Sequence, residues 1–187
     1  HIPVGHPGLT RLFGRNYRID AQPYADRMQG DLVENESANP SERAYQRFLP
    51  TADHLPKSHQ RKWLYYKLFP NIAFDIYPDQ VDFMQFLPVS GTQTLLREIS
   101  YALPDDRREM RVARYLNWRI NRRVNAEDTE LITRVQLGMQ SPTYRAGPLG
   151  TSEVCLRSFA KKLRKMIPEA RLESPPPAGW SRLANAS

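Results

Sequence analysis

The hydrophobic pattern of this sequence changes at Pro104, and that change constrains the fold more than any other feature. Before Pro104, three segments have the composition of β-strands, alternating apolar and polar side chains or apolar on both faces: 71–77, 80–87 and 93–103. After it, apolar side chains recur at helical spacing in 105–123, 124–140 and 152–167. Strands followed by helices are typical of an α+β domain, here an antiparallel sheet covered by helices on one side.

The residues between and before these strands predict how the sheet is connected. Only short runs of turn-forming residues, Pro78-Asp79 and Pro88–Gly91, lie between these strands. Such short connections predict an antiparallel meander. Residues 16–36 mix aromatic, β-branched and polar side chains and predict one or two further strands. Prolines recur among polar residues in 35–62, so we expect a long connection there that covers a pocket.

Length and composition predict one folded domain. At 187 residues with 40% hydrophobic side chains, the chain is long enough for a single core. We expect this domain to occupy residues 1–173, with a proline-rich tail at 174–187. No stretch approaches ~18 consecutive apolar residues and no signal peptide is recognised, so we expect a cytoplasmic protein without a membrane partner.

Cysteine content and charge exclude several classes of site. Cys155 is the single cysteine, which excludes an intrachain disulfide and a cysteine-held zinc or iron–sulfur centre within this chain. The net charge is +7, but many of the basic residues fall in 107–123 and 157–165, where apolar residues recur at helical spacing. We therefore interpret them as solvated helix faces or a protein-docking surface in preference to a nucleic-acid groove.

Two histidines and one aspartate are candidate metal ligands. His1, His6 and Asp128 supply two imidazoles and a carboxylate, the ligand set of a mononuclear non-heme iron(II) site with open positions for dioxygen and substrate. The histidines are five residues apart, and on an ideal helix they would point ~140° from each other. Nearby prolines and a glycine permit an irregular geometry that brings both rings to one metal. On spacing alone, structural or surface histidines remain the simpler interpretation, and His54 and His59 fit a loop.

Asp128 lies in a segment whose pattern points its carboxylate inward. Four apolar side chains follow it at helical spacing: Leu131, Ile132, Val135 and Met139. A carboxylate on such a core-facing stripe needs a partner, because an unpaired ion away from water costs several kcal/mol. The competing interpretation is a capping box, in which Asn125 begins a helix and Asp128 lies three residues later. The residues alone leave both interpretations open.

The order of these motifs resembles the catalytic half of Rieske non-heme iron oxygenases, the large subunits of ring-hydroxylating dioxygenases. The resemblance rests on four strings: His1-x4-His6-Pro7, 125–131 (NAEDTEL), 135–139 (VQLGM) and Gly147-Pro148-Leu149. It extends to about Arg171 and includes the last helix, with Phe159. The resemblance implies that His1, His6 and Asp128 are the iron ligands. It also implies a helix-grip (START-like) fold, an antiparallel sheet packed against a long C-terminal helix.

The same resemblance implies cofactors and partners outside this chain. In such oxygenases an N-terminal domain binds a Rieske 2Fe–2S cluster, and we expect that domain upstream of His1, because one cysteine cannot bind the cluster. A bridging carboxylate for the electron is also expected upstream, so no catalytic residue is assigned within the chain. The implied assembly is a homotrimer (α3), or α3β3 with a small subunit. NAD(P)H would supply the electrons through a reductase or a ferredoxin.

Two substrate classes stay open within the enzyme hypothesis. The first is an aromatic compound that is hydroxylated or oxidatively demethylated, and the second is a quaternary amine held by cation–π contacts. Candidate pocket residues are expected on the inner faces of the strands: Phe74, Phe83, Phe86 and Tyr101. Outside enzymes, the alternative is a metal-free helix-grip module that binds an apolar ligand. A basic nucleic-acid-binding domain, with affinity falling steeply with salt, is disfavoured.

Overall fold

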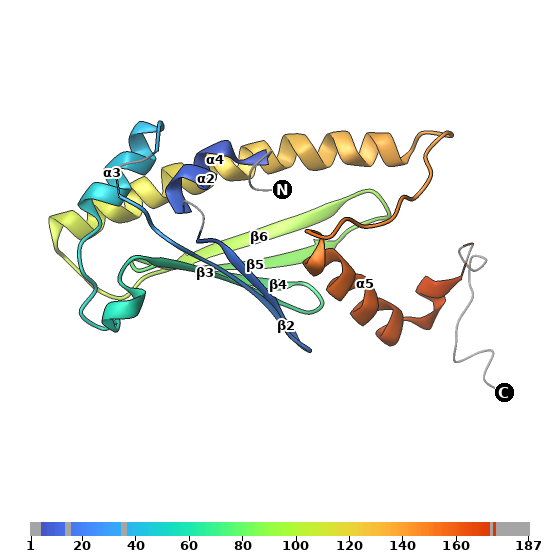
Figure 1. Ribbon diagram of the computed structural model, residues 1–187, viewed down its shortest axis with the longest axis horizontal. Coiled ribbons are helices and arrows are strands. Elements are labelled where there is room, and N and C mark those ends of the chain that lie inside the picture. The colour runs from blue at the N-terminus through green and yellow to red at the C-terminus, as the bar shows by residue number, and fades with distance from the viewer. Residues whose placement is uncertain (1–4, 14–15, 35–36, 173, 175–187) are drawn as a thin grey trace. The chain divides into compact units, whose positions relative to one another are not determined.

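The computed structural model describes residues 5–13, 16–34, 37–172 and 174 (Figure 1). The chain divides into two compact units, His1–Gly147 and Pro148–Ser187, which are described separately. In the second unit the described elements are α5 (Val154–Met166), which confirms the last predicted helix, and the short helix η2 (Pro168–Arg171). No helix in the described part of the chain combines the length and the hydropathy needed to cross a bilayer.

The first unit is built on one antiparallel sheet in which, among the described residues, six strands follow one another in sequence order. They are β1 (Arg18–Ala21), β2 (Ala25–Asp31), β3 (Lys62–Leu68), β4 (Ile72–Ile76), β5 (Val81–Pro88) and β6 (Thr94–Tyr101). The register places Asp82 of β5 opposite both Asp75 of β4 and Ser100 of β6. The predicted meander is confirmed, and so is the α+β class.

The helices of the first unit lie on one side of this sheet (Figure 1). They are α2 (Pro7–Phe13), α3 (Pro40–Phe48) and α4 (Arg108–Met139). A short helix, η1 (Lys57–His59), precedes β3. Asn39 begins α3, because its side chain accepts a hydrogen bond from the backbone N–H of Ser41 at 2.9 Å. A long helix packed against an antiparallel sheet is the fold class that the sequence predicted.

The long connection predicted over 35–62 does join β2 to β3, but it is not a loop throughout. This segment contains α3 and η1, and β3 follows at its end. The strand β3 is not predicted from the sequence, because the run from Trp63 to Tyr66 is apolar on both faces and lacks the alternation that marks a half-buried strand.

The two helices predicted over 105–123 and 124–140 form the single helix α4, which has 32 residues. No proline interrupts α4 and its one glycine, Gly138, is next to its end, so nothing in the local sequence stops the helix at Val124. Asn125 therefore lies inside α4 and does not begin a helix. The capping-box interpretation of Asp128 is wrong for that reason.

The core of the first unit lies between the sheet and its helices. Trp63 of β3 is 1% exposed. Its ring makes edge contacts with Phe13, Tyr45 and Tyr77, at centroid distances of 5.4, 5.5 and 4.5 Å. Gly30 of β2 allows the close approach of Phe13, because a Cβ at this position would lie 2.6 Å from the Cδ1 atom of the ring. This aromatic cluster anchors α2 and α3 to the sheet.

The helix α4 is longer than the strands against which it packs. Its 32 residues span about 48 Å, whereas the eight residues of β6 span about 27 Å. Its N-terminal half buries Met110, Ala113, Asn117 and Ile120. In its C-terminal half, Leu131, Ile132, Val135 and Met139 are each at least 40% exposed. The prediction of a buried stripe beside Asp128 is therefore wrong, because all four of these apolar side chains are exposed.

Candidate metal centre and substrate cavity

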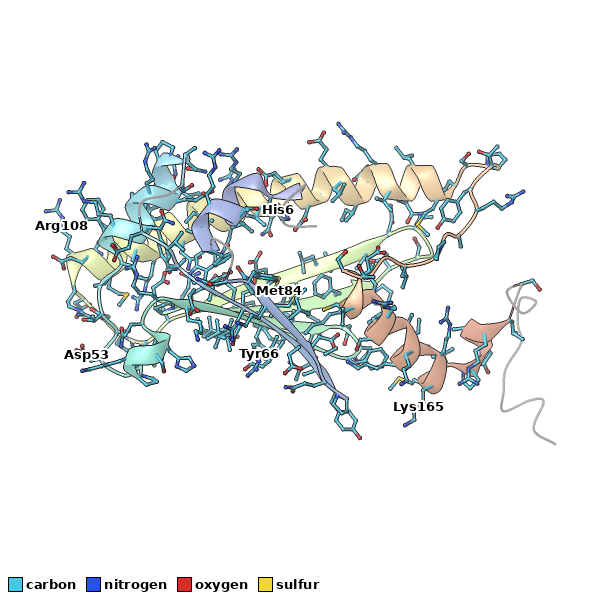
Figure 2. All side chains as sticks on the ribbon, viewed as in Figure 1. His6, Asp53, Tyr66, Met84, Arg108 and Lys165 are labelled. Atoms are coloured by element: carbon cyan, nitrogen blue, oxygen red, sulfur yellow. The ribbon has the colours of Figure 1, made fainter. Side chains whose placement is uncertain are left out.

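His6 immediately precedes α2 and lies beside α4 (Figure 2). Its carbonyl oxygen accepts a hydrogen bond from the backbone N–H of Leu9 at 3.0 Å, which closes the turn where α2 begins. Leu9 and Leu12 of α2 are buried in the core, and their packing holds His6 in place. The histidine is 2% exposed, so its ring nitrogens need partners within the protein.

Two adjacent carboxylates of α4 flank the imidazole of His6. Nε2 lies 2.9 Å from Oδ1 of Asp128, and Nδ1 lies 2.9 Å from Oε2 of Glu127. The other oxygen of Glu127, Oε1, accepts a hydrogen bond from Nε of Arg123 at 3.0 Å, four residues earlier in α4. The structure thus brings together two of the three expected ligands, His6 and Asp128, across 122 residues of sequence. His1, the third, lies outside the described residues.

The separation of these donor atoms fits a shared metal. Two ligand atoms that are each about 2.1 Å from one metal, at right angles around it, are about 3.0 Å apart. The distance from His6 Nε2 to Asp128 Oδ1 is 2.9 Å. An imidazole presents one nitrogen to a given metal, so Glu127, at the other nitrogen, is not part of this pair. Within the described ranges no group of three His, Cys, Asp or Glu side chains could hold a metal. A three-ligand site therefore needs a donor from beyond those ranges.

A row of amide–carboxylate contacts joins α4 to the inner face of the sheet. Asparagines recur at every fourth position of α4 and so share one face of the helix. Each donates through Nδ2 to a carboxylate of the sheet or its turns. The pairs are Asn117 with Asp79, Asn121 with Asp82, and Asn125 with Glu98, each at 3.2 Å. This row runs along α4 toward Asp128.

The carboxyl groups beside this row have raised pKa values. Burial, together with the nearby charges of Asp82 and Glu98, raises the pKa of Asp75 to about 7, although a hydrogen bond from Tyr77 lowers it. Burial likewise raises the pKa of Asp79 to about 6, and those of Asp82 and Glu98 rise for the same reason. The inner face beside α4 is thus a place where additional negative charge is costly and a cation would be stabilised.

A cavity of about 320 Å³ lies between α4 and the last two strands. Its lining residues are Gln80, Asp82, Glu98, Ser100, Trp118, Asn121, Arg122 and Asn125. Asn125 is three residues from Asp128 on the same helix, which corresponds to a rise of about 4.5 Å. The cavity therefore comes within about one helical turn of Asp128, although neither Asp128 nor His6 lines it, and carboxylates line the wall formed by the strands. We refer to it below as the α4–β6 cavity.

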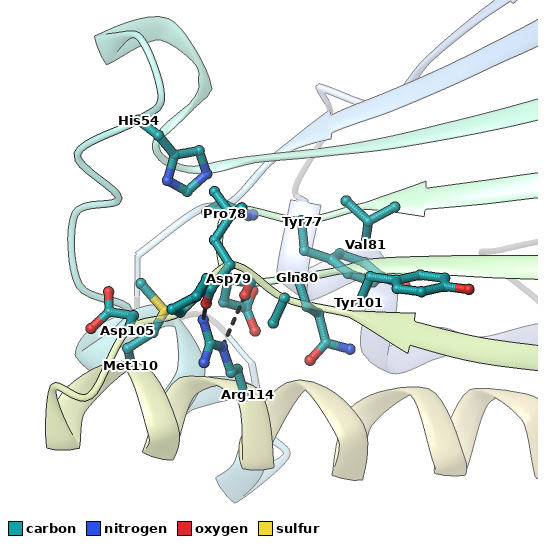
Figure 3. A pocket seen from close by; sticks show the side chains of 13 residues that line it. His54, Tyr77, Pro78, Asp79, Gln80, Val81, Tyr101, Asp105, Met110 and Arg114 are labelled. Carbon is teal, nitrogen blue, oxygen red and sulfur yellow. Dashed lines mark hydrogen bonds between the residues drawn. The ribbon is translucent and has the colours of Figure 1, made fainter.

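A second cavity, of about 370 Å³, lies near the start of α4 (Figure 3). Arg114 holds the chain around it, because its guanidinium donates to the carbonyl oxygens of Leu103 at 2.7 Å and Asp79 at 3.1 Å. His54 lines this cavity. Arg114 precedes Asp128 by 14 residues, or about 21 Å along the helix axis. The second cavity is therefore remote from the candidate metal ligands.

The four aromatic residues predicted to line a substrate pocket are divided between the two faces of the sheet. Phe83 is adjacent to the inward-facing Asp82, so it faces away from α4 with its cross-strand partner Phe74, and the two rings are 5.4 Å apart. Tyr101 shares that outer face, whereas Phe86 lies on the inner face. The expectation that all four point inward is wrong, because alternate residues of a strand face opposite sides. Their role in substrate binding stays a prediction.

Two parts of the site were missing from the residues expected from sequence. The spacing of the asparagines is visible in the sequence and indicates a polar helix face, but the strand carboxylates opposite them are set by the fold. Glu127 directly precedes Asp128 in α4. No local pattern shows which of these two adjacent acids contacts which nitrogen of His6. The tertiary contact with α2 decides this.

Comparison with known proteins places this geometry in a family. Residues 1–169 match the family described as ring hydroxylating alpha subunit (catalytic domain). A comparison with curated proteins found no match. Among solved structures, two that are described as quaternary ammonium Rieske monooxygenases share the fold. One is CntA in complex with an inhibitor, at 19% identity and a TM-score of 0.54, and the other was studied for carnitine oxidation by gut microbiota, at 16% identity and 0.53.

Each of these two alignments covers 78% of this chain but 35% and 36% of the solved chains. This chain thus spans little more than a third of their length, and at such identities the likeness shows the fold alone. The family match is broader, since it includes His6, Glu127, Asp128 and the whole sheet. The predicted resemblance to the catalytic half of Rieske oxygenases is confirmed, and the chain belongs to the ring-hydroxylating alpha-subunit family as part of its catalytic domain.

Proposed function

We propose that this chain is the catalytic part of a Rieske-type oxygenase, an oxidoreductase in which His1, His6 and Asp128 hold one iron(II) ion. The observation that carries the proposal is the 2.9 Å separation of His6 Nε2 and Asp128 Oδ1, which brings two ligand types of a facial triad together. Iron(II) held by three protein ligands supplies the activation of dioxygen, driven by electrons from a Rieske cluster.

The protein's own residues would bind and orient the substrate beside this site. The α4–β6 cavity adjoins Asp128 through Asn125, so a substrate there would present a reacting carbon toward the candidate ligands. The asparagine row fixes the carboxylates of Asp82 and Glu98 along one wall. A fixed wall keeps the bound substrate in one orientation, which is the main contribution a protein makes to such a reaction.

The charge of the wall favours a substrate with a cationic nitrogen over an uncharged aromatic hydrocarbon. Asp82 and Glu98 both have raised pKa values, and a bound cation would stabilise their ionised forms. Trp118 also lines the cavity, and an indole ring attracts an ammonium group. The Arg122 guanidinium, which also lines the cavity, lies 5.3 Å from the centre of that ring, so the ring already has a cationic neighbour. The two solved structures are of quaternary ammonium Rieske monooxygenases, which agrees with this choice.

The remaining parts of the reaction lie outside this chain. We propose that a Rieske 2Fe–2S domain precedes it and that electrons arrive from NAD(P)H through a reductase or ferredoxin. Assembly as a homotrimer, or as α3β3, would let one subunit's cluster reach the next subunit's iron. The reaction would be a monooxygenation, with hydroxylation or loss of a methyl group from nitrogen as its outcome.

The metal assignment is tested by iron binding. The protein is purified at full length, loaded anaerobically with iron(II), and its mononuclear iron is measured beside the cluster iron. We expect one mononuclear iron per chain in the wild type and a loss of nearly all of it in Asp128→Ala. Glu130→Ala is the matched control, because Glu130 lies on the same helix but is 65% exposed and pairs with Arg134. Unchanged iron in Asp128→Ala would refute the site.

The substrate class is tested separately by binding. Isothermal titration with choline and with naphthalene compares a quaternary ammonium ligand with a neutral aromatic one. We expect choline to bind and the combined change Asp82→Asn and Glu98→Gln to weaken it at least tenfold. Binding of naphthalene alone would contradict the cationic substrate and favour an aromatic one. Ligand binding that ignores a chelator, together with no iron, would instead favour the metal-free apolar-binding module.

A further inference from the structure

We infer that Glu127 is a positioning residue that orients His6 for the metal, an inference that rests on the proposed iron site. His6 has two ring nitrogens with separate carboxylate partners, Asp128 at Nε2 and Glu127 at Nδ1, both at 2.9 Å. Asp128 is the proposed ligand, so Nε2 is the nitrogen that faces the metal. Glu127 then lies at the nitrogen that a metal-bound histidine uses for its outer hydrogen bond.

The chemistry of the ring explains why this second partner matters. A neutral imidazole carries its proton on one nitrogen and its lone pair on the other, and only the lone pair binds a metal. An ionised carboxylate only accepts hydrogen bonds, so Glu127 favours the tautomer with the proton on Nδ1. That tautomer directs the lone pair of Nε2 toward Asp128. A carboxylate at this position also increases the electron density that the ring donates.

The surroundings of Glu127 hold it in this orientation. Its side chain is 29% exposed and faces a histidine side chain that is 3% exposed, so the hydrogen bond is largely shielded from water. Oε1 accepts from Nε of Arg123 at 3.0 Å, which leaves Oε2 for the ring. The ring and its two carboxylates thus form a chain of contacts from Arg123 through Glu127 and His6 to Asp128.

The alternative is that His6 is a protonated structural residue between two carboxylates, with no metal. Both interpretations predict that removing Glu127 destabilises the fold, so stability alone does not separate them. Metal affinity and the tautomer of His6 separate them. If Glu127 only formed a structural ion pair, its replacement would not change the metal affinity in steps that follow its ability to accept a hydrogen bond.

The test is the affinity of the full-length protein for cobalt(II), a spectroscopic substitute for iron(II), together with its visible absorption spectrum. We expect Glu127→Ala to weaken cobalt binding about 10- to 100-fold and to alter the spectrum. In Glu127→Gln the amide oxygen can still accept from Nδ1–H, so we expect most of the affinity to return. Glu130→Ala should bind cobalt as the wild type does. Nitrogen-15 NMR of the zinc-loaded protein should report the proton of His6 on Nδ1.

The outcomes distinguish this inference from the function on which it rests. If Asp128→Ala abolishes cobalt binding while Glu127→Ala leaves affinity and spectrum unchanged, the positioning role is refuted and the metal site stands. Equal losses in Glu127→Ala and Glu127→Gln would also refute it, because the acceptor would then not matter. If Asp128→Ala binds cobalt normally, the proposed metal site itself fails.

Discussion

Replacement of Asp79 by asparagine should make the protein's stability less dependent on pH. Asp79 is 4% exposed. Its Oδ1 accepts hydrogen bonds from the Tyr45 hydroxyl at 2.5 Å and from Asn117 Nδ2 at 3.2 Å, whereas its Oδ2 has no hydrogen-bond partner within the described residues. Burial raises the pKa of Asp79 to about 6, although both hydrogen bonds lower it. The folded protein therefore disfavours the ionised form.

The size of the effect follows from the two pKa values. The carboxyl group has a pKa of about 6 in the folded protein and 3.8 as its ordinary value. Because the pKa of Asp79 is raised in the folded protein, the contribution of this group to the unfolding free energy is fully present below about pH 4 and is lost as the pH rises through about 6. A difference of about two pKa units corresponds to about 3 kcal/mol over the whole range, and to about 2 kcal/mol between pH 4.5 and pH 8.

The assay is urea unfolding of the wild type and Asp79→Asn at both pH values. The wild type's advantage in unfolding free energy over the variant should fall by about 2 kcal/mol from pH 4.5 to pH 8, because asparagine does not ionise. Other titrating carboxyl groups, such as Asp75, are present in both proteins and cancel to first order. A difference that stays constant within about 0.5 kcal/mol would refute the raised pKa of Asp79.

Two further changes test the core. Gly30→Ala should lower the unfolding free energy by about 1–3 kcal/mol, because its Cβ would lie 2.6 Å from the buried ring of Phe13. Gly91→Ala, which has nothing within 4 Å of its Cβ, is the matched control in thermal unfolding. Tyr45→Phe should cost about 2–4 kcal/mol. This change removes the hydroxyl that donates to the buried Asp79 and that accepts a hydrogen bond from Trp63 Nε1–H at 3.2 Å. Denaturant unfolding no different from the wild type would contradict this account of the network.

The fold class could be predicted because it depends on local periodicity. Alternation over 71–77 and 93–103 predicts strands, helical spacing after Pro104 predicts helices, and short turns between strands permit an antiparallel order. The strand β3 was missed because prediction depends on this local periodicity, which β3 lacks. In β3, Trp63 and Tyr65 face the core on the inner side of the sheet, and the residues between and after them, Leu64 and Tyr66, are also apolar or aromatic. The two-residue period is therefore absent. Local pattern does not reveal a strand that is apolar on both sides.

For the site, the sequence supplied the candidate ligands but not their arrangement. The two histidines and Asp128 were identified from their chemistry and from the resemblance to a family. The inward stripe and the capping box were both wrong explanations for Asp128, because the apolar side chains after it are exposed and α4 continues unbroken through Asn125. What holds the carboxylate beside His6 is the packing of α2 against the core, a contact between residues 122 positions apart.

By itself, the sequence determined the class of fold, the family and the types of side chain available for a metal, since each follows from residue chemistry or from spacing along the chain. The tertiary structure decided which carboxylate meets which nitrogen of His6, which face of the sheet each aromatic residue occupies, and that Asp82 and Glu98 line a cavity beside α4. These outcomes depend on strand register and helix packing, which arise from contacts between distant segments and are not encoded in any local period.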